Sequence, residues 1–137
     1  MIWENGWIEK IQKLLLWEDN MSSAMIIIDK APYGCENALS GIYVALASME
    51  KNIDTDVLLI GEGVYAALKN QRSEKSIHYP SVGELIYSLF PNANLYVYTK
   101  SLIEKSIEYE DLIETAELIE GKSLLEILKS KNHVLKI

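Results

Sequence analysis

The sequence holds only one cysteine and one arginine among 137 residues, and each low count excludes some classes of function. The single cysteine, Cys35, excludes an internal disulfide and favours a reducing, cytoplasmic setting. With only Arg72 and scattered lysines against 20 acidic residues, the formal net charge is −7. Such a field repels phosphate backbones, so general nucleic-acid binding is disfavoured. No segment reaches the roughly 18 consecutive apolar residues of a membrane span, and charges from Glu4 onward interrupt any secretory signal.

Motifs for cofactors and metals are also missing. The loop after the first predicted strand matches neither of the common glycine-rich phosphate-binding patterns. Gly61-Glu62-Gly63 is too short a signal, and Glu62 would repel phosphate. His78 and His133 have no cysteine or histidine at ligand spacing. We therefore expect no cofactor and no metal site.

The apolar residues that are present predict one α/β domain. With 49% hydrophobic residues, the chain can build one core. Short apolar runs alternate with stretches of helical period, which favours parallel strands joined by helices. Strands are predicted at residues 25–28, 57–60, 95–98, 118–119 and 134–137. The predicted fold is a three-layer α/β/α domain with a mainly parallel, flavodoxin-like five-stranded sheet.

Helices are predicted between these strands. The first begins at Glu36 and buries Ala38, Leu39, Ile42, Leu46 and Met49, with Gly41, Ala45 and Ser48 allowing close approach to the sheet. A short helical turn follows Gly63. Residues 70–79 are predicted to form an exposed loop, and residues 101–107 a short helix. Two further helices would begin at capping boxes, Ser81 with Glu84 and Ser123 with Glu126.

The first 22 residues form a separate unit in this prediction, an amphipathic helical extension before the domain at 23–137. Its apolar residues recur at helical spacing, and it contains all three tryptophans. Such a stripe packs on the domain's own surface or docks on another subunit, where aromatic residues are enriched.

The working surface of a parallel sheet lies beyond the carboxyl ends of its strands. We therefore expect the loops at residues 30–36 and 61–65 to form the site. The candidate binding residues are Tyr33, Gly34, Glu62, Gly63, Tyr65 and Tyr98.

Cys35 is the candidate nucleophile. It lies at or beside a predicted helix start, where free N–H groups and the helix dipole lower the pKa of a thiol. A phosphatase-type C-x5-R loop would need arginine where Gly41 stands, and a thioredoxin-type C-x-x-C would need cysteine at Ala38. The alternative is that Cys35 is a small, half-buried structural residue.

Several of these segments resemble the DsrE/DsrF-like sulfur-relay proteins, most of all the DsrF/TusC-type subunit. The resemblance rests on Ala31-Pro32-Tyr33-Gly34, on Gly61-Glu62-Gly63-Val64-Tyr65, on Gln71, on Leu95–Tyr98 before Leu102-Ile103, and on the terminal residues 133–137. It covers about residues 24–137.

The resemblance implies a small α/β domain that assembles into trimers or hexamers, as a homo-oligomer or with related subunits. Such complexes pass persulfide sulfur between proteins, so sulfur-carrier proteins are further expected partners. Members that carry sulfur do so on a cysteine at the carboxyl end of the third strand. The matching position here is Tyr98, and a phenol cannot form a persulfide. Cys35 lies where the family commonly has Ser or Thr.

Three hypotheses follow. The first is a subunit of a sulfur-relay complex that acts as scaffold or partner without the usual sulfur-carrying cysteine. The second is a sulfurtransferase-type enzyme that uses Cys35 as its persulfide-bearing nucleophile. The third is a small-ligand-binding protein with a mouth formed by Tyr33, Tyr65 and Tyr98. Whether the chain is an enzyme stays open, as do the sulfur donor and acceptor.

Overall fold

The computed structural model describes residues 22–32, 37–69 and 85–137. The N-terminal extension, Tyr33, Gly34, Cys35, the predicted loop at 70–79 and the capping box of Ser81 and Glu84 lie outside the described residues. The strands are β1 (Ser23–Ile28), β2 (Asp54–Leu59), β3 (Leu95–Tyr98), β4 (Ala116–Ile119) and β5 (His133–Lys136). The helices are α2 (Asn37–Glu50), α4 (Thr99–Glu104) and α5 (Gly121–Ser130), with 3₁₀ turns η2 (Gly61–Ala67), η4 (Tyr87–Leu89) and η5 (Tyr109–Asp111).

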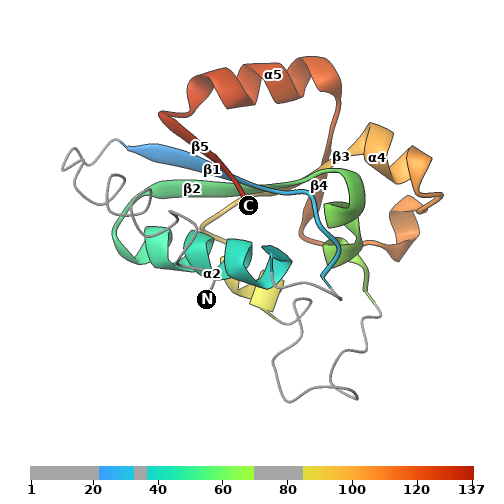
Figure 1. The fold of residues 1–137 in the computed structure, drawn as a ribbon, viewed down its shortest axis with the longest axis horizontal. Coiled ribbons are helices and arrows are strands. Elements are labelled where there is room, and N and C mark those ends of the chain that lie inside the picture. Colours follow the sequence, from blue (N-terminus) through green and yellow to red (C-terminus); the bar gives the residue numbers. More distant parts are fainter. Residues whose placement is uncertain (1–21, 33–36, 70–84) are drawn as a thin grey trace.

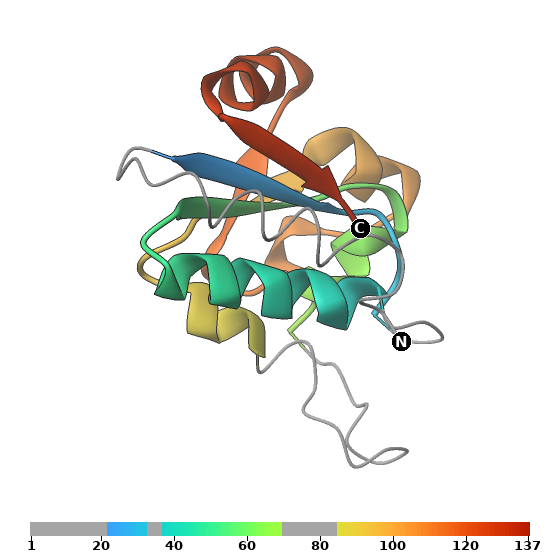
Figure 2. The same ribbon diagram turned by 60° about the vertical axis from the view of Figure 1, so that its left-hand side comes forward.

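The strands form one five-stranded sheet in the order β4-β3-β2-β1-β5, and every neighbouring pair is parallel. Helix α5 lies on one face of the sheet, and α2, η2 and η4 lie on the other (Figures 1 and 2). The predicted three-layer α/β fold with a parallel sheet is therefore confirmed. Within the described ranges, no helix combines the length and the apolar content needed to cross a membrane.

The strand order explains why α5 is alone on its face. From β1 to β4 the chain steps in one direction across the sheet, and then it returns past β1 to form β5. Connections between parallel strands are right-handed, so reversing the direction places the connecting helix on the opposite face. The connections that leave β3 and β4 consequently go to opposite faces. Such a divergence is where open α/β sheets bind ligands.

Each face of the sheet has its own apolar cluster. On the α2 face the main core includes Ile26, Ile28, Val57, Leu59 and Val97, all of them fully buried. The α5 face has a smaller cluster of Met25, Leu58 and Ile119, against which Tyr96, Leu124, Ile127 and Leu128 pack. The alternation of these residues along β1 and β2 is the period of two that the pleat imposes.

Helix α2 is buried deepest along its small residues. The predicted close approach of Gly41, Ala45 and Ser48 to the sheet is confirmed, but the predicted core residues Leu39, Leu46 and Met49 are only partly buried. The fully buried set is Ala38, Ser40, Gly41, Ile42, Val44, Ala45 and Ser48. A Cβ on Gly41 would lie 2.7 Å from two side-chain carbons of Ile28, so the helix backbone packs almost directly on β1. This close packing moves the larger side chains to the flanks of the contact.

Two predicted helix starts are wrong. Helix α5 begins at Gly121 with Glu120 as its N-cap residue, so Ser123 lies inside the helix and is not its cap. The capping-box spacing misled because Ser123 and Glu126 are simply two exposed polar positions of the first turns. The helix predicted at 101–107 is α4, which begins two residues earlier at Thr99, directly after β3, and ends at Glu104.

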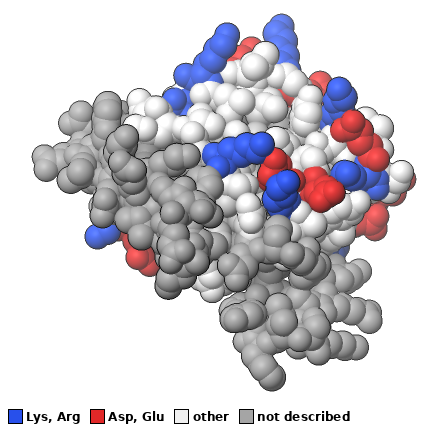
Figure 3. All heavy atoms as spheres, viewed as in Figure 1, with Lys and Arg blue, Asp and Glu red and all other residues white. Residues whose placement is uncertain are grey.

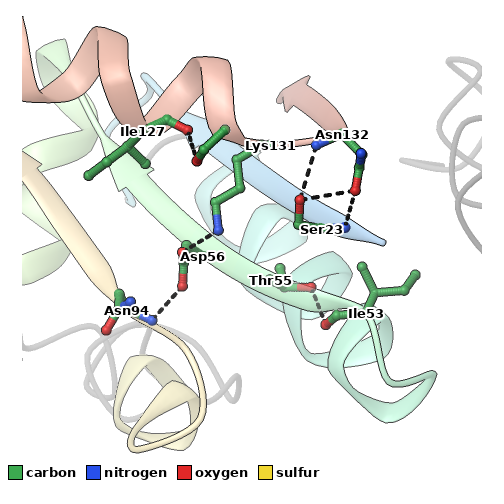
Figure 4. Close-up of polar contacts among 9 residues, drawn as sticks. Ser23, Ile53, Thr55, Asp56, Asn94, Ile127, Lys131 and Asn132 are labelled. Carbon is green, nitrogen blue, oxygen red and sulfur yellow. Dashed lines mark hydrogen bonds and ion pairs between the residues drawn. The ribbon is translucent and has the colours of Figure 1, made fainter. Parts of the chain in front are cut away.

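A buried ion pair ties α5 to the sheet at the opposite end from the predicted site. Lys131 Nζ lies 2.6 Å from Asp56 Oδ2, and both side chains are nearly buried. The other carboxylate oxygen of Asp56 accepts the backbone N–H of Asn94 at 2.8 Å (Figure 4). Nearby, the backbone N–H and the hydroxyl of Ser23 in β1 both donate to Asn132 Oδ1, and the Asn132 N–H donates to Ser23 Oγ, which joins the residue before β5 to the start of β1. The lysines are scattered along the sequence, and this distribution gave no sign that Lys131 is buried.

Candidate functional site

The carboxyl ends of β1, β2 and β3 meet at one edge of the sheet. Ile28 pairs with Leu59, and Leu59 pairs with Val97, so the residues that follow these strands lie side by side. We call the segments just after the strands the strand-end rim. It comprises Asp29, residues 60–65, residues 98–101 and residues 120–121.

The glycines of η2 are fixed by close backbone contacts. Gly61 has φ +52°, a left-handed conformation that favours glycine. Its N–H donates to Ser101 Oγ at 2.8 Å. A Cβ on Gly63 would lie 2.1 Å from the carbonyl oxygen of Ile28, so no side chain fits there. Glu62 between them is exposed. Gly61 and Gly63 therefore press the backbone of this loop against β1 and α4.

Tyr98 closes β3 on the α5 side. Its strand neighbours alternate, with Leu95 and Val97 in the core on the α2 face and Tyr96 against α5. Tyr98 therefore shares the face of Tyr96. A Cβ on Gly121 would lie 3.7 Å from the Tyr98 hydroxyl oxygen, which places this hydroxyl at the first residue of α5. The Tyr98 hydroxyl therefore lies at the point where the chain leaving β3 goes to one face of the sheet and the chain leaving β4 goes to the other.

The described residues of the predicted site all lie on the strand-end rim, but they belong to opposite faces of the sheet. Glu62, Gly63 and Tyr65 belong to η2, whose buried residues join the core on the α2 side. Tyr98 reaches the start of α5 on the other side. The structure thus places Tyr65 and Tyr98 at the same edge, attached to elements on opposite faces of the sheet. Tyr33, Gly34 and Cys35 lie outside the described residues.

The charged groups of the rim include one ion pair. Lys136 Nζ lies 2.9 Å from Asp29 Oδ2, linking the end of β5 to the end of β1. Glu62, Lys100 and Glu120 of the rim are all exposed.

On β3, two residues before Tyr98, burial and then the charges of Asp56 and Glu117 raise the pKa of Tyr96. The phenol of Tyr96 therefore keeps its proton to a higher pH than an ordinary tyrosine does.

Sequence reasoning missed two rim residues. Ser101 is 3% exposed and holds the η2 backbone through its hydroxyl, but it belongs to no recognisable motif. Thr99 donates from its hydroxyl to the carbonyl oxygen of Ile119 at 3.3 Å and so joins the ends of β3 and β4. The available signal was their position directly after a predicted strand.

The described part of the rim offers hydroxyls and carboxylates and no thiol, because residues 22–32, 37–69 and 85–137 contain no cysteine. Among these residues, no three histidine, cysteine or acidic side chains come together as ligands for a metal ion. The chemistry that the described rim can support is hydrogen bonding and positioning.

Comparison with known proteins gives a family for this arrangement. The model of the DsrE/DsrF-like family matches residues 22–137. The chain belongs to the DsrE/DsrF-like family. The uncharacterized protein MJ0989 of Methanocaldococcus jannaschii is 30% identical over 109 residues, which are 80% of this chain and 94% of that protein. A protein TusC homolog of Aliivibrio fischeri is 23% identical over 116 residues, covering 84% of this chain and 98% of that protein.

Solved structures share the fold of this DsrE/DsrF-like chain. The crystal structure of the ychN protein from E. coli matches with a TM-score of 0.77 and 22% identity, over 85% of this chain and 100% of that one. Protein MTH1491 of Methanobacterium thermoautotrophicum, described as of unknown function, matches with a TM-score of 0.62 and 14% identity, over 85% of this chain and 99% of that one.

Proposed function

We propose that this chain is a subunit of a sulfur-relay complex in which it acts as scaffold or partner rather than as the sulfur carrier. Its membership of the DsrE/DsrF-like family and its similarity to a TusC homolog along almost the whole of that protein support the proposal. The resemblance implies assembly into trimers or hexamers with identical or related subunits in the cytoplasm, and sulfur-carrier proteins as further partners.

One observation carries the non-carrier role, the position of Tyr98. It is the last residue of β3, and its hydroxyl lies at the start of α5. The resemblance places the sulfur-carrying cysteine of other members at this strand end. A carrier thiolate attacks the outer sulfur of a donor persulfide, the donor's S–S bond breaks, and the donor leaves as a thiol after taking up a proton. A phenol has no sulfur atom and therefore offers no thiolate for this exchange.

Replacing the tyrosine tests this proposal directly. The wild-type chain and a Tyr98→Cys variant are incubated with a small-molecule persulfide donor and measured by intact-protein mass spectrometry. We expect no adduct at position 98 in the wild type and an added mass of about 32 Da, one sulfur atom, on the thiol introduced in the variant. Peptide mapping after alkylation locates the added sulfur.

Tyr96→Cys is the matched control, because Tyr96 lies on the same strand and the same face but two residues inside the sheet. It should remain unmodified. An adduct on wild-type Cys35 that disappears in Cys35→Ser would contradict the non-carrier role and support the sulfurtransferase alternative. Binding of a small molecule that is lost in Tyr98→Phe, without any sulfur adduct, would support the ligand-binding alternative.

A further inference from the structure

On the face of the sheet that α2 occupies, strand β5 has no described helix of its own. Helix α2 packs on β1 and β2, and the main described contacts of β5 are with its neighbour β1. The last connection of the sheet carries α5 to the opposite face (Figure 2). Within residues 22–32, 37–69 and 85–137, the strand order therefore leaves the α2 face without a covering helix at the β5 edge.

Two apolar side chains at this edge are nevertheless buried. Leu135 pairs with Ile26, which belongs to the core on the α2 face, and Ile137 lies two residues further along on the same face. Leu135 is 9% exposed and Ile137 is 6% exposed. Helix α2, seated over β1 and β2, reaches the edge strand only in part, so these side chains need a further cover.

One flank of α2 is buried toward the same edge. Gly41 faces β1, because a Cβ there would meet side chains of that strand. Ser40, Val44 and Ser48 form a row beside Gly41 at a spacing of four residues, and all three are buried. In a right-handed helix that crosses from β1 to β2, turning from Gly41 to Val44 leads away from β2 and toward β5. Val44 is 2% exposed, whereas Tyr43 on the other flank is 41% exposed.

These two sets of residues form one surface, which we call the α2–β5 face. It comprises Ser40, Val44 and Ser48 of α2 together with Leu135 and Ile137. None of the five side chains is charged. Many of the charged side chains visible in Figure 3 lie instead at the top and the right, where Figure 1 shows α5 and α4. An uncharged surface between a helix and an edge strand suits the apolar stripe of an amphipathic helix.

Residues 1–21 are the part of the chain placed to reach this face. They lead directly into β1, where the carbonyl oxygen of Ser22 accepts the N–H of Asp54 at 3.0 Å. This is also the end of the sheet at which β5 begins. Residues 70–84 are less suitable, because they join η2 to η4 on the β2 side of α2.

The length of the segment fits the face. Its apolar stripe runs from Trp3 to Trp17, and 15 residues of helix span about 22 Å. The six residues of β1 span about 20 Å. Residues 18–21 then span up to about 13 Å, which is enough to pass from a helix layer down to the start of β1.

We infer that residues 3–17 form a helix whose apolar stripe covers the α2–β5 face of the same chain, with Trp7, Ile11 and Leu14 at the centre of the contact. This helix supplies the cover that the strand order leaves out beside α2. Because the segment is joined to β1 by only four residues, its effective concentration at the face is about millimolar, and docking needs no second copy.

Two full-length variants with equal added charge test the inference. Ile11→Lys with Leu14→Lys places two cations on the apolar stripe, and Asn5→Lys with Gln12→Lys places two on the opposite side of the helix. Tryptophan emission reports on this segment, because it contains all three tryptophans. In the wild type and in the Asn5/Gln12 control, emission should be blue-shifted relative to the urea-unfolded chain and poorly quenched by acrylamide. The stripe variant should lose both properties.

Hydrogen exchange measured by mass spectrometry locates the contact. In the stripe variant, amides of residues 133–137 should exchange about tenfold faster or more than in the wild type, because the edge strand loses its cover. Residues 95–98, at the middle of the other half of the sheet, should keep their exchange rates.

A second pair of variants tests the same contact from the domain. Val44→Lys should release the tryptophans as the stripe variant does, whereas the neighbouring Tyr43→Lys should not, because Tyr43 lies on the other flank of α2. If Val44→Lys unfolds the domain, which far-UV circular dichroism detects, the exchange of residues 133–137 in the stripe variant decides the question.

Three results would overturn the inference. The first is wild-type emission equal to that of the unfolded chain, and the second is unchanged exchange of residues 133–137 in the stripe variant. The third is a blue shift that disappears on dilution, which would show that the segment docks on another chain.

Discussion

Replacing Gly63 by alanine should destabilise the domain strongly, because the added methyl group has no room. Its Cβ would lie 2.1 Å from the carbonyl oxygen and 2.8 Å from the carbonyl carbon of Ile28, and 3.3 Å from the Cα of Asp29. All three are backbone atoms, so no side-chain rotation relieves the overlap. Either β1 or η2 therefore has to move at the rim.

The cost has two parts. Overpacking a well-packed interior costs typically about 1–3 kcal/mol. Moving the loop also weakens the hydrogen bonds from Ile60 N to Ile28 O, 3.1 Å, and from Gly63 N to Ile60 O, 2.8 Å. Each such bond contributes about 1 kcal/mol. We therefore expect Gly63→Ala to lower the free energy of unfolding by about 3 kcal/mol or more, which for a domain of this size lowers Tm by about 10 °C.

Urea unfolding followed by far-UV circular dichroism measures this loss. Tryptophan emission is unsuitable because all three tryptophans lie at residues 3, 7 and 17, outside the described domain. Gly121→Ala is the matched control. Its Cβ would lie 3.7 Å from the Tyr98 hydroxyl, an ordinary contact, and alanine in the first turn of α5 should be neutral or slightly stabilising. Equal stabilities of Gly63→Ala and wild type would show that β1 and η2 are not packed as described.

Three further changes test other contacts. Lys131→Met leaves the Asp56 carboxylate buried without its cation and should cost about 3–5 kcal/mol in urea unfolding, whereas adding Asp56→Asn should recover part of that loss. Ser101→Ala removes the acceptor of the Gly61 N–H and should cost about 1–3 kcal/mol by the same measurement. Because burial and nearby carboxylates raise the pKa of Tyr96 in the fold, the unfolded chain loses this proton first as pH rises above about 10. Stability should therefore fall through that range, and Tyr96→Phe should flatten the fall in an alkaline pH series.

The fold was largely predictable because its strands are short apolar runs with clear punctuation. Strand β3 has the predicted limits, Leu95–Tyr98. Strand β1 contains the predicted run 25–28, whereas β2 ends at Leu59, one residue short of the predicted run 57–60, and both strands begin earlier than predicted, at Ser23 and Asp54. All of these extra residues except Ala24 are polar, so hydrophobic periodicity does not reveal that they pair at the amino end of the sheet. Buried Asp56 illustrates the limit. A carboxylate inside a strand indicates a boundary until Lys131, 75 residues later, is known to pair with it.

The candidate site was predictable in position but not in orientation. Parallel strands guarantee that residues 61–65 and Tyr98 share an edge. The face to which Tyr98 turns depends on the pleat and on the crossing of α5 above it, and both depend on the strand order. The same order could not be read from the sequence, because a final strand such as β5 could pair at either edge. The start of α5 was mispredicted because the helix follows β4 directly, and its N-cap residue Glu120 makes no side-chain cap hydrogen bond.

Helix α5 contacts the rest of the domain at both of its ends. Its first residue, Gly121, lies beside the Tyr98 hydroxyl. At its other end, Lys131 is fixed to the sheet by Asp56. Along its length α5 contacts the sheet through the partly buried side chains of Leu124, Ile127 and Leu128.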